Sequence, residues 1–182
     1  DLNERIERTA KTLVEQIDTL TKIADEFSNF AKMPKAQNSE VNLIPIIVTT
    51  LDLYKEEDVF ITCENSCNDQ AIIIADKDQL SRVFNNLIKN AIQAIPSTIE
   101  GNIKVVITQD ENNYLVEVKD NGAGICDDKK NKIFVPNFTT KSTGMGLGLA
   151  MVKDIVENAN GSIWFKTKEE IGTSFFINFP KA

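Results

Sequence analysis

The first 33 residues carry apolar side chains at helical spacing and contain neither Gly nor Pro. The intervals are three or four residues, and once seven, so these side chains share one face of a helix that Pro34 ends. The stripe consists of Leu2, Ile6, Leu13, Ile17, Leu20, Ala24, Phe27 and Phe30 or Ala31. A helix of about 30 residues cannot bury such a stripe alone, which favours a partner helix over folding back on its own domain. The pattern opens without an N-cap residue, so we expect a piece of a longer protein.

After a polar linker at 35–40, the chain alternates between helical and extended patterns. Helical spacing predicts helices over 46–55, 77–95 and 147–158, the first opened by Pro45 and the second ended by Pro96. Apolar or alternating runs predict strands over 59–64, 71–75, 103–109, 114–120, 162–168 and 173–179, with a long loop at 126–144. This order predicts an α+β fold, a two-layer α/β sandwich with a mixed sheet and helices on one face, preceded by one long helix.

Composition and charge narrow the function classes. The 182 residues suit one domain with a short appendage, and the net charge of −7 argues against non-specific nucleic-acid binding. The chain has no His, which excludes a Ser-His-Asp triad and any His metal ligand or general base within it. The apolar runs are too short to form a membrane-spanning helix, so no membrane contact by this chain is expected. The first residues lack the apolar core of a signal peptide. Cys63, Cys67 and Cys126 favour free thiols in a reducing cytoplasm over a disulfide or a zinc site.

Two asparagines stand four residues apart in the helix predicted over 77–95. Asn86 and Asn90 therefore project from one face, although Asn lowers helix propensity. An amide oxygen can bind a hard cation without adding negative charge, which suits Mg²⁺ already held by a triphosphate. A solvated pair on the polar face of the helix is the alternative.

A glycine-containing turn follows the strand predicted over 114–120. Residues 120–125 read Asp-Asn-Gly-Ala-Gly-Ile. Glycine lets the backbone approach a ligand closely, and the Asp120 carboxylate can accept a hydrogen bond from an exocyclic amine such as that of adenine. A plain tight turn is the alternative, because Asp and Asn beside Gly are common turn residues.

A second glycine-rich run opens the helix predicted over 147–158. Residues 144–149 read Gly-Met-Gly-Leu-Gly-Leu. The amides and the dipole at a helix N-terminus bind phosphate. The spacing is not that of a P-loop, and Leu149 occupies the last position of Gly-x-Gly-x-x-Gly, which rejects the Rossmann and eukaryotic protein-kinase loops.

A further motif, Phe-Val-Pro-Asn-Phe-Thr-Thr-Lys, occupies residues 134–141. Phe134 and Phe138 can anchor a mobile lid on the domain, while Thr139, Thr140 and Lys141 can reach phosphates, Lys141 as a point charge. A surface loop with two core phenylalanines is the alternative.

The order and spacing of these motifs resemble the nucleotide-binding domain of bacterial sensor histidine kinases, part of the ATPase superfamily shared with DNA gyrase and MutL. Residues 86–91 resemble the N box, 120–124 the G1 box, 134–141 the F box and 144–148 the G2 box, and 172–175 resemble the last glycine-threonine element. Residues 25–34 resemble the end of the second dimerisation helix in kinases like the nitrogen-regulation sensor NtrY. The chain then divides into a partial dimerisation and phosphotransfer hairpin at 1–34, a linker at 35–40 and an ATP-binding catalytic domain at 41–182.

The resemblance implies a Bergerat ATP-binding fold with ATP and Mg²⁺ as cofactors and a lid at 126–143. Asn90 is the expected Mg²⁺ ligand, with Asn86 supporting the metal or phosphates. Asp120 is expected to accept from the adenine amine and Thr173 to fix the adenine-side water network. The backbone at 144–148 and Lys141 are expected to hold phosphates. The full expected binding set is Asn86, Asn90, Ala94, Asp120, Gly122, Gly124, Ile125, Lys141, Thr143, Gly144, Met145, Gly146, Leu147, Gly148, Leu149 and Thr173.

The resemblance also implies the reaction, transfer of the ATP γ-phosphoryl group to a His on a dimerisation helix absent from this chain. From that His the group would pass to an Asp of a response-regulator receiver domain, within a homodimeric, cytoplasmic kinase portion that a membrane segment could anchor. No catalytic residue is therefore expected within this chain, and Gln93 stands where many relatives carry Lys. An anti-sigma-factor-type serine kinase and a non-enzymatic, nucleotide-switched interaction module remain alternatives.

Overall fold

The computed structural model describes residues 2–31, 35–67, 70–139 and 146–182. Its elements in chain order are α1 (Leu2–Ala31), β1 (Ser39–Asn42), α2 (Leu43–Asp52), β2 (Val59–Asn65), β3 (Ile72–Ala75), α3 (Lys77–Ala94), β4 (Gly101–Gln109), β5 (Asn113–Asp120), α4 (Asp127–Lys130), α5 (Gly148–Asn158), β6 (Ser162–Lys168) and β7 (Gly172–Pro180). The helices and strands predicted from periodicity are present, with ends that differ by a few residues.

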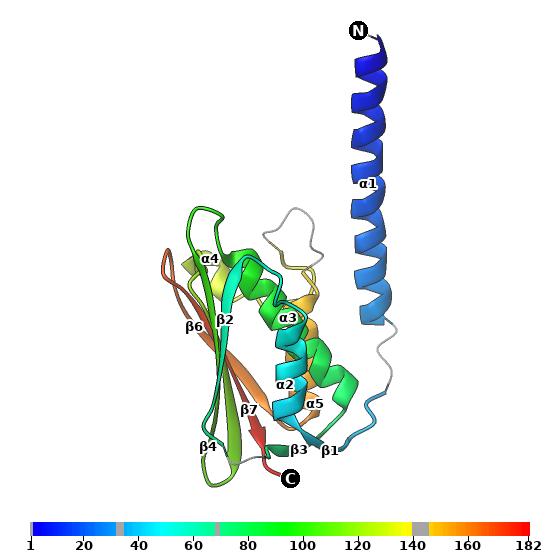
Figure 1. Cartoon of the computed structure of the whole chain (residues 1–182). Helices are drawn as coiled ribbons and strands as arrows, with labels where there is room; N and C mark the ends of the chain where they lie inside the picture. The colour runs from blue at the N-terminus through cyan, green and yellow to red at the C-terminus, as the bar shows by residue number, and fades with distance from the viewer. Residues whose placement is uncertain (1, 32–34, 68–69, 140–145) are drawn as a thin grey trace.

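A five-stranded mixed sheet forms one layer of the fold, in the order β2-β4-β5-β7-β6. β2 and β4 are parallel, and the other neighbours are antiparallel. The helices α2, α3 and α5 lie together on one face of this sheet (Figure 1). The predicted two-layer sandwich, with a mixed sheet and helices on one face, is therefore confirmed.

The core lies between this sheet and the helices. Along β4, alternate side chains point inward, and Ile103, Val105 and Ile107 are buried while Lys104 is more exposed. The helix α3 contributes Val83, Phe84 and Leu87 at helical spacing, each almost fully buried. Because α3 packs one face into this core, its opposite polar face is held at a fixed place above the sheet.

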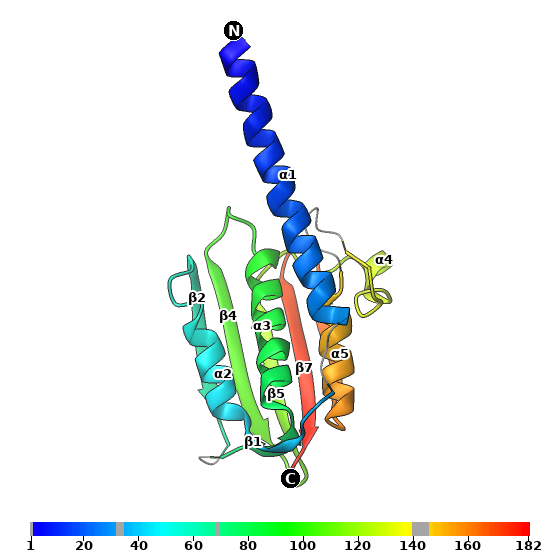
Figure 2. The same ribbon diagram turned by 90° about the vertical axis from the view of Figure 1, so that its right-hand side faces the viewer.

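The long helix α1 extends beyond the sandwich (Figures 1 and 2). Its apolar side chains Ile6, Leu13, Ile17 and Leu20 are all more than half exposed. These four side chains of the stripe are thus not buried against the domain. None of the helices among the described residues combines the length and apolarity needed to cross a membrane.

Three local features differ from the sequence expectations. The strand β1 begins at Ser39, inside the stretch 35–40 that was expected to be a linker, and pairs with β3 in a separate two-stranded sheet. A strand of four residues, of which only Val41 is apolar, is too short to show an alternating pattern in the sequence. Its extended conformation depends on pairing with β3. The helix α2 begins at Leu43 rather than at Pro45, because Asn42 caps it through its side-chain oxygen. The short helix α4 lies in the expected loop at 126–144.

All three cysteines are free, as expected from the sequence.

Candidate functional site

A cavity of about 880 Å³ opens between α3, the segment after β5, the start of α5 and β7. A volume of this size is typical of sites for small molecules. Most of the expected binding residues line it: Asn86, Asn90, Ala94, Asp120, Gly124, Ile125, Gly146, Leu147, Gly148, Leu149 and Thr173. Gly122 does not line it. Lys141, Thr143, Gly144 and Met145 lie outside the described residues.

The Asp120 carboxylate is the most buried charged group in the lining, with only 3% of its surface exposed. Its Oδ1 accepts hydrogen bonds from the Gly122 N–H (2.8 Å) and the Thr173 N–H (3.2 Å). Burial raises the pKa of Asp120, although these two hydrogen bonds act in the opposite direction. Because both bonds end on Oδ1, Oδ2 keeps its capacity to accept a hydrogen bond from a ligand.

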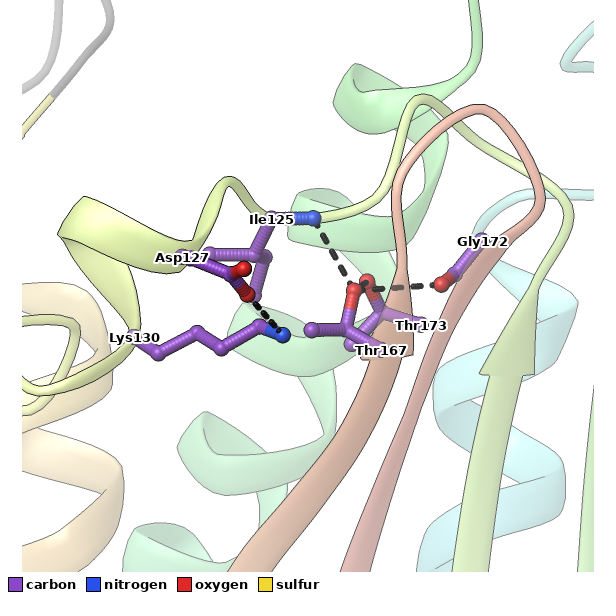
Figure 3. Close-up of polar contacts among 6 residues, drawn as sticks. All are labelled: Ile125, Asp127, Lys130, Thr167, Gly172 and Thr173. Carbon is purple, nitrogen blue, oxygen red and sulfur yellow. Dashed lines mark hydrogen bonds and ion pairs between the residues drawn. The ribbon is translucent and has the colours of Figure 1, made fainter.

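A threonine that the sequence analysis did not single out joins the segments around Asp120 (Figure 3). The Thr167 hydroxyl on β6 accepts a hydrogen bond from the Ile125 N–H (2.9 Å) and lies 3.0 Å from the Thr173 hydroxyl. A Thr at an inward position of an alternating strand carries no signal beyond strand propensity. Only the fold brings it to the binding segment.

The asparagines of α3 differ in what they can offer a ligand. The Tyr54 hydroxyl donates to Oδ1 of Asn85 (2.6 Å), so this oxygen is already used. The Asn86 side-chain NH₂ donates to the Arg82 carbonyl (2.9 Å), which turns its Oδ1 toward Gly148. Asn90 is half-buried in the cavity wall. Neutral amide oxygens therefore stand at this wall, as expected from the sequence.

Two motif glycines make room for protein atoms rather than for a ligand. A Cβ on Gly122 would lie 2.5 Å from the Ala94 carbonyl oxygen, which accepts a hydrogen bond from the Ala123 N–H. A Cβ on Gly148 would lie 2.7 Å from Oδ1 of Asn86. The expectation that Gly122 lets the chain pass close to a base is thus not what the structure shows, because its close neighbour is the end of α3.

The chain reverses sharply at Gly146, where φ is +68°. A side chain here would be strained and would also meet the backbone of Phe138, at 2.2 Å from its carbonyl oxygen. The backbone of Phe138 therefore lies against Gly146, just before the start of α5.

The charges around the cavity oppose those of the whole chain. Arg82, Lys89 and Lys129 line it beside a single carboxylate, Asp120, although the chain has a net charge of −7. The helix α5 begins there, and its N-cap residue Leu147 makes no side-chain cap hydrogen bond. The first N–H groups of a helix have no partner within the helix itself. Cations and a helix N-terminus together suit phosphate groups. The sequence did not mark Arg82 or Lys89 as cavity residues, because both lie on the polar face of a helix, where solvated cations are common.

The segment after Ile125 is anchored to the sheet by aromatic packing. Phe134 makes edge-to-face contacts with Phe165 and Phe175, with ring centroids 6.0 and 6.4 Å apart. An ion pair between Asp127 and Lys130 spans α4 and lowers the pKa of Asp127 (Figure 3). The predicted anchoring by Phe134 is therefore observed.

The donor set suits Mg²⁺ only in company with an anion. Among the described residues, no group of three or more His, Cys, Asp or Glu side chains is gathered that could hold a metal ion. The amide oxygens of Asn86 and Asn90 are hard, uncharged donors, which bind Mg²⁺ best when phosphate oxygens complete its coordination.

Comparison with known proteins decides the family. Residues 75–182, more than half of the chain, match the family described as histidine kinase-, DNA gyrase B-, and HSP90-like ATPase. The chain belongs to this ATPase family. The resemblance to the histidine kinase members of this ATPase family, inferred from the four motifs, is confirmed.

Three relatives of this chain are named as kinases. Sporulation kinase A of Bacillus subtilis is 44% identical over 113 residues, 62% of this chain and 18% of its own length. Sensor histidine kinase ZraS of Escherichia coli is 34% identical over 174 residues, 94% of this chain and 37% of its own length. The chain therefore spans less than two fifths of either relative.

The third relative, histidine kinase ThkA, has solved structures. Its catalytic domain superposes with a TM-score of 0.71 at 32% identity, covering 80% of this chain and 96% of that domain. ThkA in complex with the response regulator protein TrrA superposes with a TM-score of 0.75 at 28% identity, covering 94% of this chain and 50% of that one. The ATPase domain here thus has the fold of a histidine kinase catalytic domain.

The contact between Asn86 and Gly148 predicts a coupled effect on nucleotide binding. Gly148→Ala places a methyl group against Oδ1 of Asn86 and should weaken ATP binding by about 1–2 kcal/mol. In an Asn86→Ala background the obstacle is gone, so the same substitution should cost less than about 0.5 kcal/mol further. Calorimetric titration of the two single variants and the double variant measures this coupling. Additive losses would mean that the two residues act independently.

The raised pKa of Asp120 predicts a pH-dependent stability effect. The folded state binds this proton more tightly than the unfolded state, so the stabilising contribution is present below the unfolded pKa and is lost as pH rises through the folded pKa. Asp120→Asn removes that loss. Relative to the wild type, the variant should therefore gain unfolding free energy as the pH rises through and above the ordinary pKa of an Asp carboxyl, which urea denaturation at each pH measures.

Asp110 provides the opposite control. Hydrogen bonds from the N–H groups of Asn112 and Asn113 lower the pKa of Asp110, so its contribution is present above the unfolded pKa and is lost on acidification. Asp110→Asn should therefore lose relative stability as pH rises over the same range. If both variants followed the same trend, the environment assigned to Asp120 would be wrong.

Proposed function

We propose that this domain binds ATP with Mg²⁺ and transfers the γ-phosphoryl group to a His on a dimerisation helix outside these 182 residues. The chain has no His of its own, so the acceptor belongs to another segment or another molecule. Catalysis of such a transfer consists mainly of positioning the phosphates and neutralising their charge. No general base within the ATPase domain is required.

The polarised lining of the cavity is the observation that carries this proposal. A buried carboxylate acceptor, Asp120, suits the exocyclic amine of adenine, while Arg82, Lys89 and the uncapped start of α5 suit phosphates. Asn90 would give its amide oxygen to Mg²⁺, with Asn86 beside it. The cation supplies charge neutralisation at the phosphates when bound, and the protein holds the triphosphate in line with the acceptor.

The remaining assignments rest on the relatives. The matches to ZraS and to the ThkA–TrrA complex extend over 94% of this chain and so include α1. This supports 1–34 as part of a dimerisation hairpin, with the ATP-binding domain at 41–182. We propose that the phosphoryl group then passes to a response-regulator receiver domain, as the complex of ThkA with TrrA suggests. Such a relay, together with free cysteines, supports a cytoplasmic location.

The test is phosphoryl transfer in trans. The chain is mixed with a separately produced dimerisation hairpin that carries the acceptor His, and with Mg²⁺ and ATP labelled on the γ-phosphate. Acid-labile label should appear on the hairpin and not on this chain. Asn90→Ala should slow transfer at least about tenfold, or about 1.4 kcal/mol, and should remove the gain in ATP affinity that Mg²⁺ gives.

Asn65→Ala is the matched control, because Asn65 lies at the end of β2, outside the cavity lining, and its side chain accepts a hydrogen bond from the Cys67 N–H at an exposed turn. Its rate should equal that of the wild type. Acid-stable label on a serine of a partner would favour the serine-kinase alternative. ATP binding without transfer to any hairpin would favour the nucleotide-switched interaction module.

The exposed stripe of α1 predicts association of this chain through that helix. Leu13, Ile17 and Leu20 are each more than half exposed, as expected for a helix that packs on others in a bundle. Leu13→Glu with Ile17→Glu should shift the chain toward monomer in sedimentation velocity across a concentration series. Lys11→Glu, which changes the net charge equally on another face, should not. A wild-type chain that is monomeric at every concentration would contradict this assignment. The side chain of Phe27, also expected in the stripe, is not among those that the structure describes.

A further inference from the structure

The Thr167 hydroxyl lies where three segments meet beside the ATP cavity (Figure 3). It accepts from the Ile125 N–H at 2.9 Å, and it lies 3.1 Å from the Gly172 carbonyl oxygen and 3.0 Å from the Thr173 hydroxyl. Thr167 is half-buried on β6 and does not line the cavity of about 880 Å³, although it lines a smaller adjoining hollow with Asp120 and Thr173. Any effect it has on a ligand must therefore pass through its neighbours.

The hydrogen bonds of Thr167 can be assigned from donor and acceptor capacity. A hydroxyl has one proton to donate and two lone pairs that accept. The Ile125 N–H can only donate and the Gly172 carbonyl can only accept. All three contacts are satisfied together only when Thr167 donates to Gly172 and the Thr173 hydroxyl donates to Thr167.

This assignment fixes what Thr173 offers to the cavity. Its proton points to Thr167, so only lone pairs remain toward a ligand. Thr173 lines the cavity and its backbone N–H donates to Asp120, whose carboxylate is also an acceptor. Both side chains therefore present acceptors to the same edge of a bound base. That arrangement complements an amino group and opposes a carbonyl oxygen, which would face acceptors without a donor.

We propose that Thr167 is a specificity-determining positioning residue that holds the Thr173 hydroxyl as an acceptor and so makes the site select a base with an exocyclic amino group, such as adenine, over one with a carbonyl, such as guanine. This inference rests on the proposed binding of ATP. It adds a residue outside the cavity that acts by orienting a proton.

The hairpin that carries Thr167 is held in place by other contacts as well. The Glu170 N–H donates to the Ala123 carbonyl (2.9 Å), and β6 pairs with β7 along its whole length. Val is nearly the same shape as Thr and suits a strand. Thr167→Val should therefore remove the hydroxyl while the hairpin stays in position, as thermal unfolding can verify.

The experiment compares dissociation constants for ATP and GTP, measured by competition with a fluorescent ATP analogue. In Thr167→Val the Thr173 hydroxyl is free to rotate and donate to a carbonyl. ATP should bind about threefold more weakly and GTP no more weakly than in the wild type, so the ratio of the GTP to the ATP dissociation constant should fall at least about threefold. Thr167→Ser keeps the hydroxyl and should keep the wild-type ratio.

Thr108→Val is the matched control, a Thr-to-Val change on the inner strand β4 outside the cavity lining, and its ratio should be unchanged. Equal weakening of ATP and GTP by Thr167→Val would show a merely structural residue and overturn the proposal. An unchanged ratio, or a lower ratio in Thr167→Ser as well, would overturn it too. If the wild-type chain binds no ATP, the proposed function itself is wrong. That result differs from a failure of the Thr167 proposal, in which the wild-type chain binds ATP and only the effect of Thr167→Val departs from expectation.

Discussion

The binding site depends on one carboxylate that is buried where three chain segments meet. Asp120 ends β5, and its Oδ1 accepts from the backbone on both sides, from Gly122 in the following turn and from Thr173 on β7. Burying a charge is unfavourable unless hydrogen bonds compensate for the lost water. Two protein donors satisfy one oxygen, and a ligand donor would satisfy the other. The cost of burial therefore becomes a preference for a particular ligand.

The helix α3 runs along the cavity from the neighbourhood of Asp120, where we propose that the base binds, to the start of α5, where we propose that the phosphates bind. Its C-terminal residue Ala94 accepts from the Ala123 N–H beside Asp120. On successive turns of α3 toward its N-terminus, Asn90 and then Asn86 line the cavity wall. Asn86 lies against Gly148 at the start of α5. Since the opposite face of α3 is locked into the core, the two ends are held at a fixed separation.

Much of this arrangement was accessible from sequence, and the exceptions have a common cause. Apolar periodicity located α3 and the alternating strands β4 to β7, and the paired Asn86 and Asn90 and the turn at Asp120 pointed to a nucleotide. Thr167 and β1 escaped notice because their roles come from partners distant in the chain. Arg82 did so because a cation on a solvated helix face looks the same whether or not a cavity lies beside it. Residue type and spacing report local structure well, but they report which segments meet only through a resemblance.

The close packing at the motif glycines has a consequence for judging divergent relatives. Gly122 is confined by the carbonyl of Ala94, and Gly146 by the backbone of Phe138. These neighbours are protein atoms, so the pressure to keep glycine there would persist in a descendant that had lost its nucleotide. Such a silent domain would still carry a recognisable glycine signature. If the proposed binding of ATP holds, the presence of Asp120, Thr173 and Asn90, which line the cavity, is better evidence that a domain of this shape still binds a nucleotide.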